Sequence, residues 1–481
     1  MSALLVCVAR RVEARAVRSG APTADIVTRD AVTEPTEFAS AFTARAARAR
    51  AVAVMGLASA LDGVARPGDL VVTTDCATND TTAPMSSAVT ITNALRARGL
   101  TVHRDPAWLL DALVDDDTTR VASFAAGRPV AVVRAITGHA PGNGWSPDDV
   151  TLAPAIRSLR AAAVVLDAWA RACRERRVLV AGPRSFCAGV ERAIEIVERA
   201  LARRGAPVYV RRQIVHNAHV VEDLEARGAV FVEELHEVPD GATVVLAAHG
   251  VTPAVRDNAQ ERDLDVIDAT CPLVAKVHRE AKRFADRGYS IVLVGHEDHE
   301  EVQGTIGEAP NSIRVVASAD EAERLHVADP TRVAWLTQTT LAVDEVHDVV
   351  DRLRARFPVI EGPSSDDICY ATQNRQEAVR AIAPECDLLL VVGSRNSSNS
   401  NRLVEVAQRE GCVAHLVEDD TELQLEWLRD AATIGITAGA SAPDALVWRI
   451  IDRLRSLGRV EVDERVVMHE SVRFTLPVEV R

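Results

Sequence analysis

The sequence has no long apolar run and no cluster of basic residues. Its apolar runs, such as Ala3 to Ala9 and Leu388 to Val392, are far shorter than the about 20 residues that a helix needs to cross a bilayer. The N-terminal end has no basic stretch and no cleavage site, so we expect a cytoplasmic protein. The formal net charge is −14 and no Lys/Arg run is present, so we expect neither nucleic acid nor an anionic membrane as a partner.

Closely spaced cysteine pairs are absent too. The eight cysteines are scattered over the whole length, at positions 7, 86, 173, 187, 271, 369, 386 and 412. This spacing does not match a disulfide framework, and it lacks the CxxC pairs of zinc fingers and ribbons. In a reducing compartment some of these thiols are candidates for metal ligands or catalytic groups.

The sequence does contain ample material for hydrophobic cores. It has 481 residues, of which 47% are hydrophobic and 26% charged, and this length predicts about two to four domains. The N-terminal third alternates strand-like and helical stretches, which predicts an α/β domain. We expect strands at Leu4–Val8, Val52–Met55, Leu70–Thr73 and Val130–Val133, and helices at Glu37–Arg50 and Ser87–Arg98. An Ala-rich helical stretch, residues 151–176, leads into the rest of the chain.

Two segments of this third resemble a known family. They are MGLASALDGVARPGDLVVTTD, from Met55 to Asp75, and LVDDDTTRVASFAAGRPVAVVRAI, from Leu113 to Ile136. Both resemble the nucleoside phosphorylase/nucleosidase family. That family usually has a Met–Glu pair for the ribose where this chain has Asp116 and Asp117, and its Gly-rich phosphate-binding features are few here. We therefore expect residues 1–176 to form a phosphorylase-like, non-catalytic domain that helps assembly or regulation.

The rest of the chain is organised around Val178 to Leu201. Val178–Ala181 has the pattern of a buried strand, a tight turn follows, and helical spacing begins at Val190. Cys187 therefore lies at the junction between a strand and the helix that follows it. Helix-end amides and the helix dipole favour a thiolate there, which is the form needed by a nucleophile or a soft-metal ligand. The alternative is a buried structural cysteine.

The same pattern of strand, polar cluster and helix repeats to the C-terminal end. The predicted strands are Val208–Val210, Val244–Ala247, Val266–Ile267, Ile291–Val294, Val333–Leu336, Leu388–Val392 and Thr433–Ile436. A helix from about Asn374 to Ala383 follows Cys369. In open parallel α/β sheets, ligands bind beyond the carboxyl ends of the strands. We therefore expect one shared central site, formed by several strand ends.

Three cysteines stand at such junctions: Cys187, Cys271 and Cys369. Isolated thiolates from three structural units suit a cuboidal iron–sulfur cluster, and a [4Fe–4S] cluster normally has four Cys ligands. With three ligands, one iron keeps an open position that can bind a substrate as a Lewis acid. We interpret Cys386 and Cys412 as core or surface thiols, because Cys386 opens a strand and Cys412 lies beside a helix terminus.

Three histidines and one glutamate also lie at strand ends, and each has two interpretations. His216, His249 and His299 are metal ligands or phosphate binders, or else ordinary core histidines. Glu301 is a proton donor if desolvation raises its pKa, or else a solvated acid in an acidic loop.

Small polar residues precede two of the predicted helices. Ser397, Ser398 and Asn399 offer hydroxyls, an amide and free helix-end N–H groups to an anion. The alternative is an ordinary N-cap, and Ser441 has the same two interpretations. A neutral cradle of this kind fits an acidic protein that must still bind phosphate.

A set of motifs carries a second and much more extensive resemblance. In order, they are PRSFCAGVERAI, IVHN, AAHGV, DATCPLV, HEEVQGT, TQTTL, DDICYATQNRQEAV, GSRNSSNSNRL and TAGASAPD. From about Arg177 to the C-terminal end, the chain resembles the LytB family of 4-hydroxy-3-methylbut-2-enyl diphosphate reductases. The resemblance implies a three-lobed α/β fold around a central iron–sulfur cluster, preceded here by the separate α/β domain. It also implies the last step of the non-mevalonate isoprenoid pathway, a reductive dehydroxylation that gives isopentenyl and dimethylallyl diphosphates.

The resemblance further implies a division at residue 177, with the reductase in residues 177–481, and roles for individual residues. Cys187, Cys271 and Cys369 would hold one [4Fe–4S] cluster per subunit. Glu301 would deliver protons, with Thr339 and His299 orienting the substrate hydroxyl. The diphosphate of a small allylic substrate would be bound by His216, His249, Ser397, Ser398, Asn399 and Ser441. A ferredoxin or flavodoxin-type protein would donate the electrons.

Two positions depart from that family's pattern. The family usually has Gly where Ser185 stands and Pro where Glu300 stands, which bears on loop geometry and rate more than on reaction type. Two other functions stay open: a non-catalytic regulatory or nucleoside-sensing protein on the same scaffold, and a zinc hydrolase that uses the same Cys and His. The intact cysteine set with Glu301 and Thr339 argues against the first, and metal content decides the second.

Overall fold

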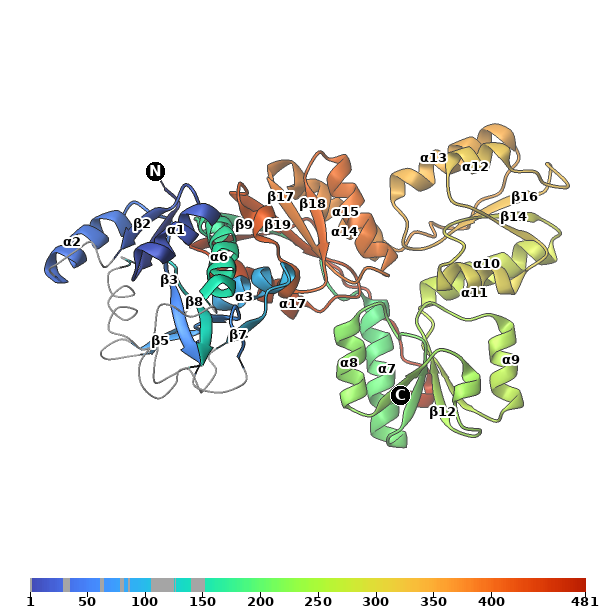
Figure 1. Ribbon diagram of the computed structural model, residues 1–481. Coiled ribbons are helices and arrows are strands. Elements are labelled where there is room, and N and C mark those ends of the chain that lie inside the picture. The colour runs from blue at the N-terminus through green and yellow to red at the C-terminus, as the bar shows by residue number, and fades with distance from the viewer. Residues whose placement is uncertain are drawn as a thin grey trace. The chain divides into compact units, whose positions relative to one another are not determined.

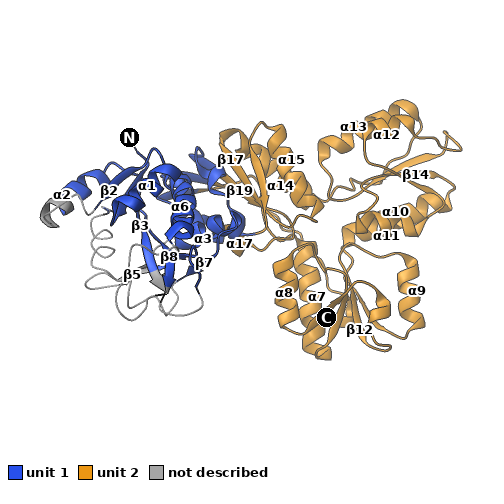
Figure 2. Cartoon of the chain, in the orientation of Figure 1, with its two compact units in different colours: residues 1–178, 419–434, 448–462 blue, residues 179–418, 435–447, 463–481 orange. Residues whose placement is uncertain are grey.

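A computed structural model describes residues 2–28, 35–60, 65–77, 82–84, 87–104, 125, 127–139 and 152–481, and Figure 1 shows its helices and strands. The chain forms two compact units, which Figure 2 colours separately. Unit 1 is Met1–Val178, Asp419–Ile434 and Trp448–Val462; unit 2 is Leu179–Glu418, Gly435–Val447 and Asp463–Arg481. Among the described residues, no helix combines the length and the apolar character needed to span a bilayer.

Unit 1 contains a six-stranded sheet with strand order β2-β1-β3-β8-β4-β7. β2, β1, β3 and β8 pair in parallel, whereas β4 is antiparallel to β8. The strands are β1 Leu4–Val8, β2 Asp25–Thr28, β3 Ala51–Ala60, β4 Leu70–Val72, β7 Val102–Arg104 and β8 Val130–His139. The helices are α1 Arg11–Gly20, α2 Pro35–Ala46, α3 Ala88–Ala97 and α6 Leu152–Ala172, and β5 Asp75–Ala77 pairs with β6 Thr82–Pro84. The α/β character predicted for this region is confirmed.

One predicted helix of unit 1 is wrong at its end. α2 ends at Ala46 and not at Arg50. The backbone N–H groups of Arg50 and Ala51 both donate to the carbonyl of Ala3, at 2.9 and 3.1 Å, which draws the chain into β3 beside β1. Sheet pairing therefore overrides a helical pattern that continues past the end of the helix.

Unit 1 also includes two segments from late in the chain. The buried guanidinium of Arg176 donates to the carbonyl of Leu428 at 2.9 Å, and Ser87 Oγ donates to the carbonyl of Ser456 at 2.8 Å. No side-chain pattern marks these contacts, because their acceptors are backbone carbonyls. The division of the chain into residues 1–176 and 177–481 stays a prediction.

Unit 2 contains two parallel sheets and much of a third, and Figure 2 shows the corresponding lobes in orange. The first has strand order β11-β10-β12-β13, the second β15-β14-β16, and the third β18-β17-β19-β9-β20. The strands are β9 Arg176–Gly182, β10 Val208–Arg211, β11 Ala229–Val232, β12 Thr243–Leu246, β13 Asp265–Asp268, β14 Ser290–Val294, β15 Ile313–Val316, β16 Val333–Thr337, β17 Leu388–Val392, β18 Ala414–Val417, β19 Thr433–Ala438 and β20 Val460–Val466. The predicted strands of this region are confirmed.

Helices follow the strands, as a parallel sheet requires. They are α7 Ala188–Arg204, α8 Ala218–Ala226, α9 Pro253–Glu261, α10 Pro272–Asp286, α11 Glu300–Glu308, α12 Ala319–Arg324, α13 Val343–Arg356, α14 Tyr370–Ile382, α15 Ser398–Arg409, α16 Leu425–Leu428 and α17 Asp444–Arg455. All five residues of β17 are buried, because a parallel strand covered on both faces is apolar throughout. α7 packs its apolar face on β10, where Val197 and Val208 share one core.

Two helices begin earlier than predicted. α7 starts at Ala188 and not at Val190, and α14 starts at Tyr370 and not near Asn374. Their first turns carry small or polar residues, so the apolar spacing that reveals a helix appears only later. The correction places Cys187 and Cys369 directly at the N-caps of α7 and α14.

Candidate functional site

Three cysteines of unit 2 occupy the same structural position. Cys187, Cys271 and Cys369 are the N-cap residues of α7, α10 and α14. All three line one pocket. Gly189 shows how close two of the sulfurs are, because a Cβ built on it would lie 2.8 Å from Cys271 Sγ and 3.7 Å from Cys187 Sγ. The cysteines predicted as metal ligands are therefore brought together, on elements from different lobes.

Burial has the largest effect on the pKa of two of these thiols. Together with the neighbouring cysteines, it raises the pKa of Cys271 to about 12 and that of Cys369 to about 11. The N–H groups at the helix ends lower each pKa, but they do not overcome desolvation. A metal ligand must be a thiolate, so binding of a metal would favour deprotonation of both residues.

The donor set fits an iron–sulfur cluster. Thiolates are soft ligands that select iron–sulfur clusters, zinc or copper(I). Among the described residues, no group of three His, Cys, Asp or Glu side chains is close enough to hold a single metal ion. A cluster carries its metals at separate corners, so its ligands need not converge on one point. Gly189 has no Cβ, so the space beside the sulfurs of Cys187 and Cys271 stays open.

Glu301 is a buried carboxylic acid that lines the same pocket. Its side chain, on the first turn of α11, is 2% exposed. Thr339, just after β16, donates its backbone N–H to Oε1 at 2.7 Å and its hydroxyl to Oε2 at 3.0 Å. Burial outweighs these hydrogen bonds and raises the pKa of Glu301 to about 7. The acid can therefore hold a proton near neutral pH, and the interpretation as a solvated acid is wrong.

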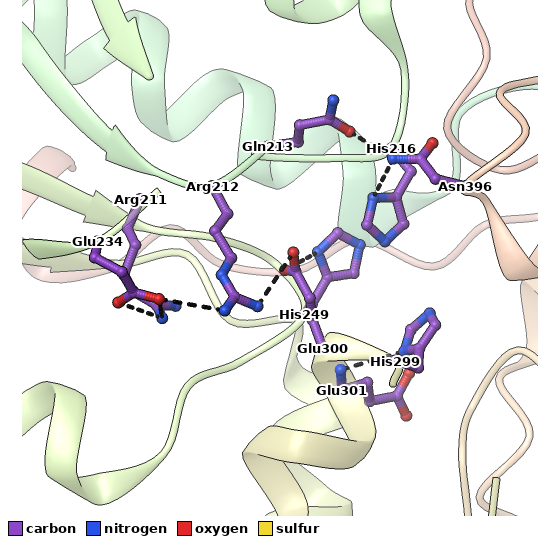
Figure 3. A network of polar contacts seen from close by, with 10 residues as sticks. All are labelled: Arg211, Arg212, Gln213, His216, Glu234, His249, His299, Glu300, Glu301 and Asn396. Atoms are coloured by element: carbon purple, nitrogen blue, oxygen red, sulfur yellow. Dashed lines mark hydrogen bonds and ion pairs between the residues drawn. The ribbon is translucent and has the colours of Figure 1, made fainter. Parts of the chain in front are cut away.

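The three predicted histidines form a cluster, shown in Figure 3. The rings of His216 and His249 are stacked with centroids 4.0 Å apart, and the ring of His299 meets both edge-on at 5.9 and 6.1 Å. Burial and the other histidines lower the pKa of His216 to about 2 and that of His299 to about 4. Both rings are therefore neutral at pH 7.

The contacts of His299 fix the position of its proton. Its Nδ1 accepts the backbone N–H of Glu301 at 3.2 Å, so the proton of the neutral ring is on Nε2. His299 is also the N-cap of α11. The ring is thereby tied to the same helix turn that carries the buried acid.

The helix that follows β17 supplies the small polar residues. Ser397 is the N-cap of α15 and accepts the backbone N–H of Ser400 at 3.3 Å, so its N-cap interpretation is correct. Ser441 donates its hydroxyl to the carbonyl of His216 at 3.0 Å. Asn399 is 5% exposed, and neither its Oδ1 nor its Nδ2 has a hydrogen-bond partner. The amide of Asn399 is therefore the group of this segment with the most unused hydrogen-bonding capacity.

Some polar and aromatic residues at the pocket were not predicted as site residues. Tyr370, Thr340 and Phe474 line the pocket, and Gln338 lies beside it, where its amide donates to Ser398 Oγ at 3.2 Å. Gln338 and Thr340 stand within TQTTL, so that motif could have indicated them. Phe474 lies in an irregular segment after β20, and no sequence pattern indicates it.

The fold and the pocket together define an α/β enzyme whose site gathers thiols, a buried acid and neutral histidines. The family model described as LytB protein matches residues 178–455, which is more than half of the chain. The chain therefore belongs to the LytB protein family, and it is an oxidoreductase.

Individual relatives agree with this membership. A protein of Nocardia farcinica named 4-hydroxy-3-methylbut-2-enyl diphosphate reductase is 57% identical over 307 residues, which are 64% of this chain and 91% of that protein. A protein of Mycobacterium tuberculosis named 4-hydroxy-3-methylbut-2-enyl diphosphate reductase 1 is 57% identical over 311 residues, covering 64% of this chain and 94% of that protein. The structure of E-1-hydroxy-2-methyl-but-2-enyl-4-diphosphate reductase from Plasmodium falciparum matches with a TM-score of 0.60 and 37% identity, over 63% of this chain and 95% of that one.

The predicted reductase resemblance is thereby confirmed. The matched residues begin at Val178, so they do not include the N-terminal third. The segments that resemble nucleoside phosphorylases lie partly outside the described residues, and the non-catalytic role of that third stays a prediction.

Proposed function

We propose that the chain reduces 4-hydroxy-3-methylbut-2-enyl diphosphate to isopentenyl and dimethylallyl diphosphates, and that the three-cysteine pocket of unit 2 is its active site. The reaction, the last step of the non-mevalonate isoprenoid pathway, follows from membership of the LytB family and from the names of the relatives. The observation that supports the site assignment is the burial of Glu301 in the same pocket as the three thiols, which raises the pKa of its carboxyl to about 7.

Cys187, Cys271 and Cys369 would hold one [4Fe–4S] cluster per chain. Such a cluster supplies electrons one at a time, and an iron without a protein ligand can bind an oxygen as a Lewis acid. Val190 and Val274 add apolar side chains to the same pocket. The electrons would come from a ferredoxin or flavodoxin-type protein, and we propose that the enzyme is cytoplasmic.

The reaction needs two protons as well as two electrons. The C–O bond to the hydroxyl breaks, the hydroxyl leaves as water after taking one proton, and the allylic carbon skeleton takes the second. Glu301 would be the acid. It lines the pocket, and its raised pKa of about 7 lets it retain a proton near neutral pH. Thr339 holds the carboxyl in place through two hydrogen bonds. Nε2–H of the neutral His299 is available to orient the substrate hydroxyl.

The diphosphate would bind among the residues with unused hydrogen-bonding atoms. Asn399 Oδ1 and Nδ2 and His216 Nε2 are buried and have no hydrogen-bond partner. Buried polar atoms are normally paired, so a cluster of unpaired ones in a pocket indicates a polar ligand. Ser397, Ser398 and Ser441 would complete the contacts around the helix end of α15.

Turnover of the purified protein tests this function. The anaerobic holoenzyme is given 4-hydroxy-3-methylbut-2-enyl diphosphate and a chemically reduced viologen dye, and the products are separated. Formation of both five-carbon diphosphates with oxidation of two dye molecules per product is the expected result. Absence of both products from a cluster-loaded protein would refute the function and favour the regulatory alternative. A colourless protein that contains zinc would favour the zinc hydrolase.

A further inference from the structure

Glu300, the residue beside the buried acid, belongs to a different network from Glu301. Its Oε2 lies 3.4 Å from His249 Nδ1, and its Oε1 lies 3.5 Å from a guanidinium nitrogen of Arg212. Figure 3 shows Glu300 between these two side chains, while Glu301 turns to the other side of the helix end. Glu300 is therefore placed to act on a histidine of the pocket without lining the pocket itself.

We propose that Glu300, held in place by Arg212, is a positioning residue that orients His249 for binding the diphosphate. The inference rests on the proposed function, because it concerns how the same pocket holds its substrate. Glu300 does not line the pocket but contacts His249, so it acts through that ring.

The charge state of Glu300 supports this role. Burial alone would raise its pKa, but His249, His216 and Arg212 together hold the pKa at about 2. The side chain is therefore a carboxylate throughout the working pH range, with 22% of its surface exposed. A carboxylate that accepts from one ring nitrogen of a histidine fixes the ring's orientation and leaves the other nitrogen for a ligand.

Arg212 also contacts a second carboxylate, that of Glu234. Its second guanidinium nitrogen lies 3.3 Å from Glu234 Oε1, and Glu234 also binds Arg211 at 2.9 Å. Arg212 has a positive φ of 56°, a conformation that costs energy for a residue with a side chain. Its backbone N–H donates to Val232 O at 2.6 Å, which ties the strained turn to the end of β11. The turn after β10 therefore holds Arg212 in a strained backbone conformation, with its guanidinium beside Glu300.

The two stacked histidines consequently have different partners. The amide nitrogen of Asn396 lies 3.4 Å from His216 Nδ1, and because an amide nitrogen only donates, this ring carries its proton on Nε2. His216 has no carboxylate at its ring nitrogens among the described residues, whereas His249 has Glu300. His216 is thus a neutral donor to a diphosphate, and His249 is the ring whose orientation a carboxylate fixes.

Substitution of Glu300 by glutamine tests the role, because it removes the charge and keeps the shape. We expect KM for the substrate to rise about tenfold with kcat within about twofold, as for the loss of one charge-assisted hydrogen bond that acts in binding. Iron content and the visible spectrum should stay unchanged. Glu300→Asp should recover part of the affinity. Glu297→Gln, an exposed acid of the same loop, is the matched control and should have no effect.

A binding measurement separates this inference from the proposed function. Inorganic pyrophosphate is titrated into the anaerobic holoenzyme, wild type and Glu300→Gln, and the dissociation constants are compared. An increase of about tenfold in Glu300→Gln supports the positioning role, even if the wild type fails to reduce the proposed substrate. Equal dissociation constants, or a loss of kcat at unchanged KM, would overturn it. Arg212→Gln should weaken binding less, and combining it with Glu300→Gln should add little, because both act through one contact.

Discussion

Units 1 and 2 each bury a glutamate, and the surroundings of the two side chains are opposite. Glu13 of α1 is 3% exposed, and its carboxylate accepts the backbone N–H groups of Arg10 and Leu57, at 2.8 and 3.0 Å. Glu301 is 2% exposed, accepts only from Thr339 among the described residues, and borders a pocket lined by thiols and histidines. Burial of a carboxylate therefore does not by itself mark a functional acid. The groups around it decide whether it only joins backbone segments or also faces a pocket.

Two thiols repeat this contrast. Cys173 of unit 1 is 2% exposed and burial raises its pKa to about 12, as for Cys271 of unit 2. Cys173 follows the last turn of α6, where its backbone N–H donates to Trp169 O at 2.9 Å. Cys271 instead begins a helix and shares its pocket with two further cysteines. A raised thiol pKa is common to both, and only the grouping of cysteines points to a metal site.

Removal of a cluster ligand should have the largest effect. We expect Cys271→Ser to lose most of its iron and nearly all turnover, because the remaining two thiols cannot hold a cluster tightly. Iron and acid-labile sulfide assays measure this. Cys173→Ala is the control from unit 1 and should keep the wild-type iron content. Full cluster occupancy in Cys271→Ser would show that it is not a ligand.

Glu301→Gln should have the next largest effect. The amide keeps the shape and the hydrogen bond from the Thr339 backbone but has no acidic proton, so turnover should fall by about 10² to 10⁴. Iron content should equal that of the wild type, which separates loss of the acid from loss of the cluster. Turnover within about twofold of the wild type would remove Glu301 as the proton donor.

A methyl group at Gly189 should act on the thiols directly. The added Cβ would lie 2.8 Å from Cys271 Sγ, which is closer than real Cβ contacts allow, so a sulfur or the helix end must shift. We expect Gly189→Ala to lower cluster occupancy after reconstitution several-fold and Gly189→Ser to lower it further. Occupancy is read from the iron-to-protein ratio. Unchanged occupancy in both variants would mean that the sulfurs are not held near Gly189.

The pH dependence should reflect the raised pKa of Glu301. Its folded-state pKa of about 7 lies above its ordinary value of 4.5, so the proton is held below pH 7 and is lost as pH rises through 7. We expect kcat to fall above about pH 7, by about tenfold per unit, and Glu301→Gln to lose that decline. Stability linked to this group has the same sign: it is present below pH 4.5 and is lost through pH 7. A flat profile between pH 6 and 9 would contradict the assignment.

Glu13→Gln should have the smallest effect on activity. An amide accepts hydrogen bonds only through its oxygen, whereas the Glu13 carboxylate accepts through both oxygens. One backbone N–H therefore loses its partner, which costs about 1–3 kcal/mol of unfolding free energy. Thermal unfolding of the holoenzyme measures the loss. Turnover per cluster should equal the wild type. A fall in turnover without a fall in stability would show that the contrast between the two glutamates is false.

The strands of unit 2 and the grouping of Cys187, Cys271 and Cys369 are predictable from the sequence, and the reasons are physical. The strand ends and the three cysteines follow from apolar runs that stop at polar clusters, because parallel strands bury their whole length. The helix starts at Ala188 and Tyr370 are missed because small and polar first turns hide the helical period. The thiol pKa values are not predictable either, since desolvation depends on neighbours from three lobes.

The partners of individual side chains are the least predictable part. Glu300 and Glu301 are adjacent and chemically identical, yet one contacts His249 and Arg212 and the other Thr339. Their directions diverge because successive residues of a helix point about 100° apart, which a sequence shows, but what each meets depends on tertiary packing. Phe474 enters the pocket from an irregular segment that has no periodicity to interpret.

The most direct test of the three-cysteine site is the iron and acid-labile sulfide content of anaerobically purified protein, measured together with its Mössbauer spectrum. We predict about four iron and four sulfide per chain, with one iron spectroscopically distinct because it has no cysteine ligand. Absence of iron after anaerobic reconstitution, or four equivalent irons with a fourth cysteine bound, would contradict that site.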